Sequence, residues 1–173
     1  MKAVISMFLP VLVFTSVTLA GPMKETYNGS DEFERMKTLA GTWKGEMDMG
    51  QGVQPITVVY RVVSGGSAIE ERTFAGTPME MITMYHDQGG KLAMTHYCSL
   101  HNRPGMILKA SDDDSISFDF DPTCGIDPKK EMHMHSLKLK FTNSDELTQT
   151  WTHFEDGKPA DPHPIILKRV SQS

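Results

Sequence analysis

The sequence has few cysteines and no excess of positive charge. Two cysteines among 173 residues cannot form the framework of a disulfide-rich miniprotein. Seventeen Lys and Arg against 22 Asp and Glu give a net charge of −5, whereas a nucleic-acid backbone or an anionic membrane surface requires a basic face on its partner. Glycine and proline are spread along the chain, which argues against a collagen-like or disordered protein. We therefore expect one domain large enough to bury a core.

The sequence also lacks the short motifs of the common enzyme classes. It contains no phosphate-binding Gly-Lys motif, no nucleophile elbow, no His-Glu-x-x-His and no Cys-x-x-Cys. Hydrolase, kinase and thiol-redox functions thus lose their strongest support. No catalytic residue stands out, and we expect a binding protein more readily than an enzyme.

One long hydrophobic run is present, at the N-terminus. Residues 1–20 begin with Lys2, continue as an apolar stretch and end in the small residues of Thr18-Leu19-Ala20, which is typical of a cleaved signal peptide. Pro10 interrupts the run, and this disfavours the alternative of a membrane anchor. We expect cleavage before Gly21, export to the periplasm or the cell exterior, and no integral membrane segment thereafter.

Residues 30–173 are predicted to form a single all-β domain behind a flexible segment at 21–29. Ser30 and the two acidic residues after it are typical of a helix start. Apolar and polar residues then alternate with a period of two. About ten strands are expected, at 43–49, 56–62, 68–74, 79–86, 91–98, 106–110, 116–120, 132–141, 147–154 and 165–170. Such successive hairpins predict a sandwich or a closed up-and-down antiparallel β-barrel of about 8–10 strands.

The motif Gly41-x-Trp43 directly follows the expected helix and resembles the signature of the calycins, which include the lipocalins and fatty-acid-binding proteins. The resemblance implies that Trp43 closes one end of the barrel beneath a basic residue of the last strand. Arg169 is the expected partner, because a planar guanidinium stacks on an indole.

Further segments resemble those of an exported lipocalin-like family of unknown function. They are LAGTW (39–43), SGGSA (64–68), GTP (76–78), MYH (84–86), THYC (95–98), HMHS (133–136) and LTQTW (147–151). This resemblance implies a barrel and export. The family has no established activity, so no catalytic residue is implied.

Strand alternation predicts that three strands each direct His or Cys into the barrel. The expected inward sets are His133 and His135 with Leu137 and Leu139, His96 and Cys98 with Met94, and His86 with Met84. With Tyr60 from the apolar stripe at 56–62, these residues are the expected ligand-binding set. His101, His153 and His163 are expected at loops or strand ends, exposed to solvent.

The inward histidines allow two interpretations. His133 and His135 could bind a metal or haem with a third nitrogen from His96 or His86, and such imidazoles suit Zn, Cu or haem. Alternatively, each ring belongs to a polar network with carbonyls, hydroxyls or trapped water. An interior rich in methionine would also adapt to varied apolar ligands.

Cys98 and Cys124 also allow two interpretations. In an oxidising compartment they are expected to form a disulfide, worth roughly 3.5 kcal/mol in the chain-entropy model. The alternative is Cys98 as a thiolate ligand beside His96, which a disulfide would exclude.

The sequence therefore predicts an exported lipocalin-like protein that holds a small apolar or amphipathic ligand, oriented by His133, His135 and His96. One alternative is a metal- or haem-binding barrel that uses the same residues. The other is a filled barrel that acts as an interaction domain.

Overall fold

A computed structural model describes residues 27–48 and 52–172. The expected signal peptide at 1–20 and Met49 lie outside the described residues. Among the residues described, no helix is long and apolar enough to cross a bilayer. Tyr27, which the sequence placed in a flexible segment, donates a hydrogen bond from its hydroxyl to Asp87 Oδ2 at 3.1 Å.

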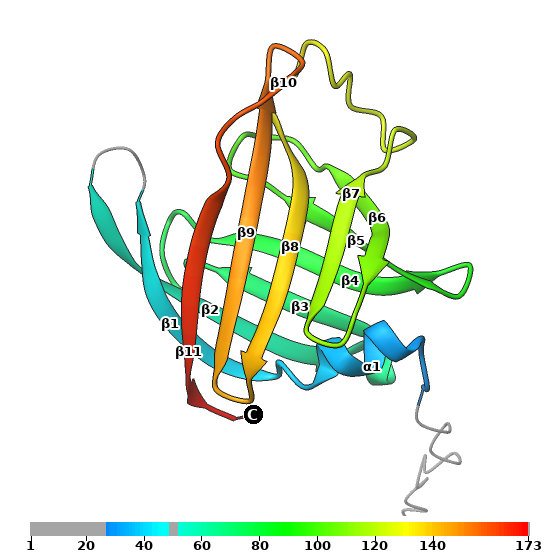
Figure 1. Ribbon diagram of the computed structural model, residues 1–173, viewed down its shortest axis with the longest axis vertical. Coiled ribbons are helices and arrows are strands. Elements are labelled where there is room, and N and C mark those ends of the chain that lie inside the picture. Colours follow the sequence, from blue (N-terminus) through cyan, green and yellow to red (C-terminus); the bar gives the residue numbers. More distant parts are fainter. Residues whose placement is uncertain (1–26, 49–51, 173) are drawn as a thin grey trace, which may run out of the picture.

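The helix α1 (Asp31–Lys37) covers one end of the molecule (Figure 1). Ser30 is its N-cap, and the Ser30 hydroxyl oxygen accepts a hydrogen bond from the Phe33 amide at 3.2 Å. The same hydroxyl donates to Asp87 Oδ1 at 2.8 Å, so the cap also ties the helix to a neighbouring strand. Phe33 and Met36 are fully buried and fix α1 against the core.

Most of the described chain after α1 forms antiparallel β-strands. The strands are β1 (Gly41–Asp48), β2 (Val53–Val63), β3 (Ala68–Thr73), β4 (Met81–Gln88), β5 (Lys91–Tyr97), β6 (Gly105–Ser111), β7 (Ser115–Phe120), β8 (His133–Asn143), β9 (Glu146–Glu155), β10 (Lys158–Pro159) and β11 (His163–Ser171), with a single 3-10 turn, η1 (Ser64–Gly66), between β2 and β3.

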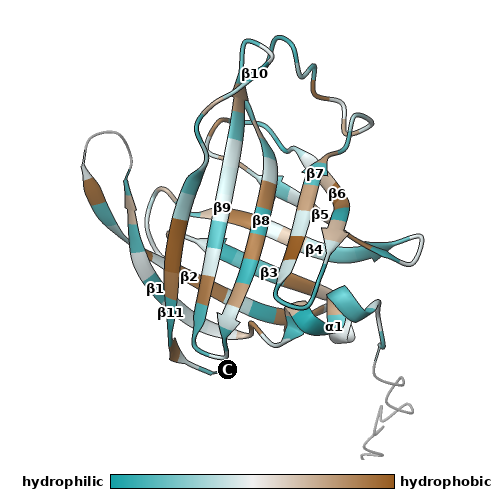
Figure 2. Cartoon of the chain, in the orientation of Figure 1, coloured by the Kyte–Doolittle hydropathy of each residue, from teal (hydrophilic) through white to brown (hydrophobic). Residues whose placement is uncertain are grey.

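The strands close into a barrel. Each strand from β1 to β9 pairs with its successor, and β11 returns to lie between β9 and β1. The two-residue strand β10 pairs with the end of β9 in an antiparallel hairpin. A ten-stranded antiparallel barrel results, as the sequence predicted. Along the strands, hydrophobic and hydrophilic residues alternate because one side of each strand faces the interior (Figure 2).

Trp43 and Arg169 close the end of the barrel that α1 covers. The guanidinium carbon of Arg169 lies 4.2 Å from the centre of the Trp43 ring, a cation–π contact. Its nitrogens donate to the carbonyl oxygens of Thr38 and Ala40, both at 2.8 Å. The Trp43 indole N–H donates to the Leu39 carbonyl oxygen at 2.8 Å. The last strand is thus bonded to the segment that links α1 to β1.

Candidate functional site

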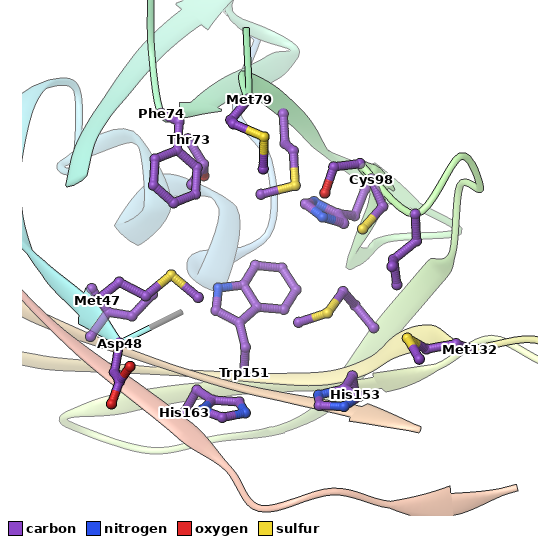
Figure 3. A pocket seen from close by; sticks show the side chains of 16 residues that line it. Met47, Asp48, Thr73, Phe74, Met79, Cys98, Met132, Trp151, His153 and His163 are labelled. Carbon is purple, nitrogen blue, oxygen red and sulfur yellow. The ribbon is translucent and has the colours of Figure 1, made fainter. Parts of the chain in front are cut away.

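A cavity of about 450 Å³ opens at the end of the barrel away from α1 (Figure 3). It lies between the last residues of β1, β3, β5 and β9 and the first residues of β4, β8 and β11. Five of its sixteen described lining residues are methionine. The main apolar wall is formed by Met47, Met79, Met81, Met132, Met134 and Trp151. The fold thus provides an apolar space that reaches the surface.

His96 is an enclosed polar group of this wall. It stands on β5 in phase with buried Leu92 and Met94, and only 3% of its surface is exposed. Its Nδ1 lies 2.8 Å from the Thr83 hydroxyl on β4, and its ring centre is 5.0 Å from that of Trp151. Burial lowers the pKa of His96 to about 4, so the ring is neutral at neutral pH.

A buried polar network stands behind Trp151. The indole N–H donates to Gln149 Oε1 at 3.2 Å, and Gln149 Nε2 donates to the Tyr60 hydroxyl and to Glu71 Oε1. Tyr85 donates its hydroxyl proton to Glu71 Oε2 at 2.6 Å. The network fixes the position of the indole that lines the cavity.

Glu71 is fully buried without a cationic partner among these contacts. Thr73, another cavity-lining residue, donates from its hydroxyl to Glu71 Oε1 at 3.0 Å. Burial raises the pKa of Glu71, while the hydrogen bonds it accepts oppose that rise. Its neighbour Glu70 faces outward and forms ion pairs with Arg61 and Arg72.

The mouth of the cavity carries polar side chains. His153 on β9 and His163 on β11 lie with ring centres 5.8 Å apart and ring planes 8° apart. Asp48, at the end of β1, lines the same rim. Strand alternation could have revealed His153, because it follows the inward-facing Trp151 by two residues. His163 is exposed, as expected from the sequence, whereas His153 is only partly exposed.

His133 and His135 lie elsewhere than the sequence predicted. Neither histidine lines the cavity, whereas Met134, which stands between them in the sequence, does. The pairing of β8 with β9 shifts register between Met134 and Ser136, so His135 is an extra, bulged residue. Leu137 and Leu139 face inward as expected. The extra residue offsets the alternation by one position, so Met134 faces the same side as Leu137 and Leu139. His133 and His135 therefore do not point into the cavity.

The two histidines instead form an aromatic cluster with Phe120 and Phe154. The His135 ring is stacked on Phe154 at 3.6 Å and on Phe120 at 5.0 Å, measured between ring centres. His133 is fully buried, and its Nδ1 lies 2.7 Å from the Glu131 carbonyl oxygen. The cluster therefore fastens the end of the 121–132 loop to the barrel wall.

Four other residues of the expected ligand-binding set do not line the cavity: Tyr60, Met84, His86 and Met94. On β4 the inward residues are Met81, Thr83 and Tyr85. Met84 and His86 therefore lie on the opposite, partly exposed face. Tyr60 and Met94 do face inward, but both are fully buried in the packed core. Of the expected set, His96 and Cys98 line the cavity.

The expected disulfide is absent from the structure, and Cys98 and Cys124 are both free thiols. The two side chains point to different places. Cys98 lines the cavity, where burial raises the pKa of its thiol. Cys124 packs over Gly105, where an added Cβ would lie 3.0 Å from the Cys124 Cβ.

The expected metal site is likewise not supported. Within the part of the chain that the structure describes, no three His, Cys, Asp or Glu side chains are grouped to hold a metal ion. His133 and His135 belong to the loop cluster and His96 to the cavity, so the three do not converge.

Comparisons with known proteins agree with the fold. No family model and no curated protein matches the sequence. A solved structure, that of Rv2717c from M. tuberculosis, is similar with a TM-score of 0.55 at 12% sequence identity, covering 83% of this chain and all of that one. At this identity the similarity shows a shared barrel fold.

Proposed function

We propose that this protein is an exported lipocalin-like binding protein whose cavity holds a small apolar or amphipathic ligand. The observation that carries the proposal is the open, methionine-rich cavity of about 450 Å³. Small-molecule sites are typically concave, mostly apolar and roughly 300–1,000 Å³ in volume, with a few polar groups. A barrel filled by its own side chains would have no such space, so the interaction-domain alternative is less well supported.

The lining suits a ligand rather than a solvent-filled crevice. Methionine side chains are flexible and polarisable, so they adjust to ligand shape and make favourable contacts with aromatic rings. The Trp151 indole, held by Gln149, offers a flat surface among them. His96 replaces His133 and His135 as the buried imidazole that can orient the ligand, with His153 and His163 at the mouth.

Export and the lipocalin-like assignment rest on the sequence. The leader-like pattern of residues 1–20 supports export. The Gly41-x-Trp43 motif supports the assignment, and so does the stacking of Arg169 on Trp43 in the barrel. An export assay of the full chain, followed by N-terminal sequencing of the mature protein, tests the first point. Retention of residues 1–20 in the mature protein would contradict it.

Binding is tested with an apolar fluorescent probe such as Nile red. The wild-type protein is expected to bind it stoichiometrically, with energy transfer from Trp151. Met134→Trp places a larger side chain in the cavity and should abolish binding. Ile166→Trp is the matched control, since Ile166 is 56% exposed on the outer face of β11, and it should bind like the wild type.

Two results would overturn the proposal. One is failure of the wild-type protein to bind the probe, or equal binding by Met134→Trp. The other is the presence of bound Zn, Cu or haem, which metal analysis and absorption spectroscopy of untagged protein would detect. Stoichiometric metal or haem that is lost when His96 or His153 is replaced would make the cavity a cofactor site instead.

A further inference from the structure

His96 has one ring nitrogen available to a ligand. Nδ1 is bonded to the Thr83 hydroxyl, which fixes the ring, and none of the described residues partners Nε2. Across the described residues, Asn102 Oδ1 is the one fully enclosed side-chain polar atom without a partner. Nε2 is therefore not sealed in the core, and the space that reaches it is the cavity that His96 lines.

The cavity wall offers no cation to an anionic ligand. None of its sixteen described lining residues is Lys or Arg, and His96 is neutral because burial lowers its pKa to about 4. The buried carboxyl group of Glu71 lies one hydrogen bond behind Thr73. A carboxylate or phosphate at the inner end would lose its hydration without a partner, which is strongly unfavourable.

The inner wall is equally unsuited to a cation. Among the described lining residues Asp48 is the one acidic side chain, and it lies at the rim on the end of β1. Glu71 does not line the cavity. Its oxygens already accept hydrogen bonds from Thr73, Tyr85 and Gln149. An ammonium group next to His96 would therefore be buried without a counter-ion.

We infer that the ligand is an uncharged, mainly apolar molecule whose inner end carries one hydroxyl or carbonyl group hydrogen-bonded to His96 Nε2. A neutral imidazole donates or accepts at Nε2 according to its tautomer, so both groups are suitable. His96 is then a specificity-determining residue, and the methionines and Trp151 contact the apolar part. The inference rests on the proposed binding function.

A matched set of small aromatic compounds tests it: naphthalene, naphthol, naphthoate and naphthylmethylamine, each competing with Nile red at pH 7.5. The wild-type protein is expected to bind naphthol about three- to tenfold more tightly than naphthalene, which is the usual gain from one hydrogen bond. Naphthoate and naphthylmethylamine should bind at least about tenfold more weakly than naphthol. Tighter or equal binding of either charged compound would overturn the inference.

Replacing His96 identifies the residue responsible. His96→Phe keeps a ring of similar size, and it should remove the preference for naphthol while naphthalene still binds. His86→Phe is the matched control, because His86 lies on the outer face of β4, and it should keep the preference. If His96→Phe does not fold, His96→Met provides the same comparison. Survival of the naphthol preference without His96 would overturn the inference.

The two proposals fail in different ways. If the wild-type protein binds neither Nile red nor any of the four compounds, the binding function itself is wrong. If it binds Nile red and naphthalene but shows no preference for naphthol, the binding function stands and the role of His96 is wrong.

Discussion

His133 Nε2 and His135 Nδ1 lie 2.9 Å apart and form a hydrogen bond between two imidazoles. The Glu131 carbonyl oxygen can only accept, so the His133 Nδ1 that contacts it at 2.7 Å carries the proton. In neutral His133, Nε2 is then an acceptor and His135 Nδ1 is the donor. The contacts therefore fix both tautomers, and nitrogen NMR should show both rings protonated at Nδ1 when neutral.

His133→Phe is expected to destabilise the protein by about 1 kcal/mol, because it removes two part-buried hydrogen bonds, to the Glu131 carbonyl and to the His135 N–H. Urea unfolding monitored by circular dichroism measures the change. His101→Asn serves as the control, since His101 is exposed and has a positive φ of 65° that asparagine tolerates. Equal stability of His133→Phe and the wild type would show that the bond contributes nothing.

Stability should fall at acidic pH because of His96. Its pKa is about 4 in the folded protein and 6.5 in the unfolded chain, so the unfolded state binds more protons between these values. Each pH unit between about 6.5 and 4 then removes about 1.4 kcal/mol, or about 3 kcal/mol in total. The lowered pKa of His135, caused mainly by burial, acts in the same direction. A wild-type pH profile no steeper than that of His96→Gln would contradict this account.

Glu71 has the opposite effect on pH dependence. Burial raises its pKa above the usual 4.5, so between pH 4.5 and the folded value the unfolded chain releases its proton first. The unfolding free energy of the wild type relative to Glu71→Gln should therefore decrease as pH rises through this window. Chemical unfolding of both proteins from pH 4 to 8 measures the difference. A difference that increases with pH would place a charged, well-stabilised carboxylate at this position.

Arg169→Met should cost about 2–4 kcal/mol, since it removes the cation–π contact with Trp43 and leaves the Thr38 and Ala40 carbonyl oxygens without donors. In a Trp151→Phe background, the emission of Trp43 should also shift to longer wavelength as water reaches its ring. Lys168→Met is the control from an exposed neighbouring position of the same strand. An unchanged emission spectrum in Arg169→Met would show that the guanidinium does not shield the indole.

Thiol titration should find two reactive cysteines per chain under non-reducing conditions. Cys98 is expected to react more slowly at pH 7.5, because burial raises the pKa of its thiol and less thiolate is present. Bound Nile red should slow Cys98 further and leave Cys124 unchanged, and Cys98→Ser and Cys124→Ser assign the two rates. If no free thiols are found, the two cysteines form the disulfide that the sequence predicted.

Much of the fold follows from local sequence. The hairpins are marked by turn residues such as Gly89-Gly90 between β4 and β5, where both glycines adopt positive φ. Alternation along β5 correctly placed His96 beside the buried Leu92 and Met94. Turns and strand alternation depend on residues that are close together in the sequence, so both can be predicted from the sequence alone.

The site was harder to predict because two strands do not reveal their inward face. On β4 both faces carry apolar residues, so Met84 and His86 looked as suitable as Met81 and Tyr85. On β8 the bulge at His135 changes which residues before it face inward, so the inward direction predicted for His133 and His135 was wrong. The network around Glu71 joins residues that are 78 positions apart, Glu71 and Gln149. Tertiary pairing decides each of these arrangements.

The position of α1 has a kinetic consequence. Because Phe33 and Met36 pack into one end of the barrel while the cavity opens at the other, a guest molecule would leave by the route it entered. Residence time and association rate would then depend on the same rim side chains, Met79, Leu100 and Met132, all at least 38% exposed. A bulkier residue at Met132 would slow both arrival and departure, so exchange could be retarded with little change in the dissociation constant.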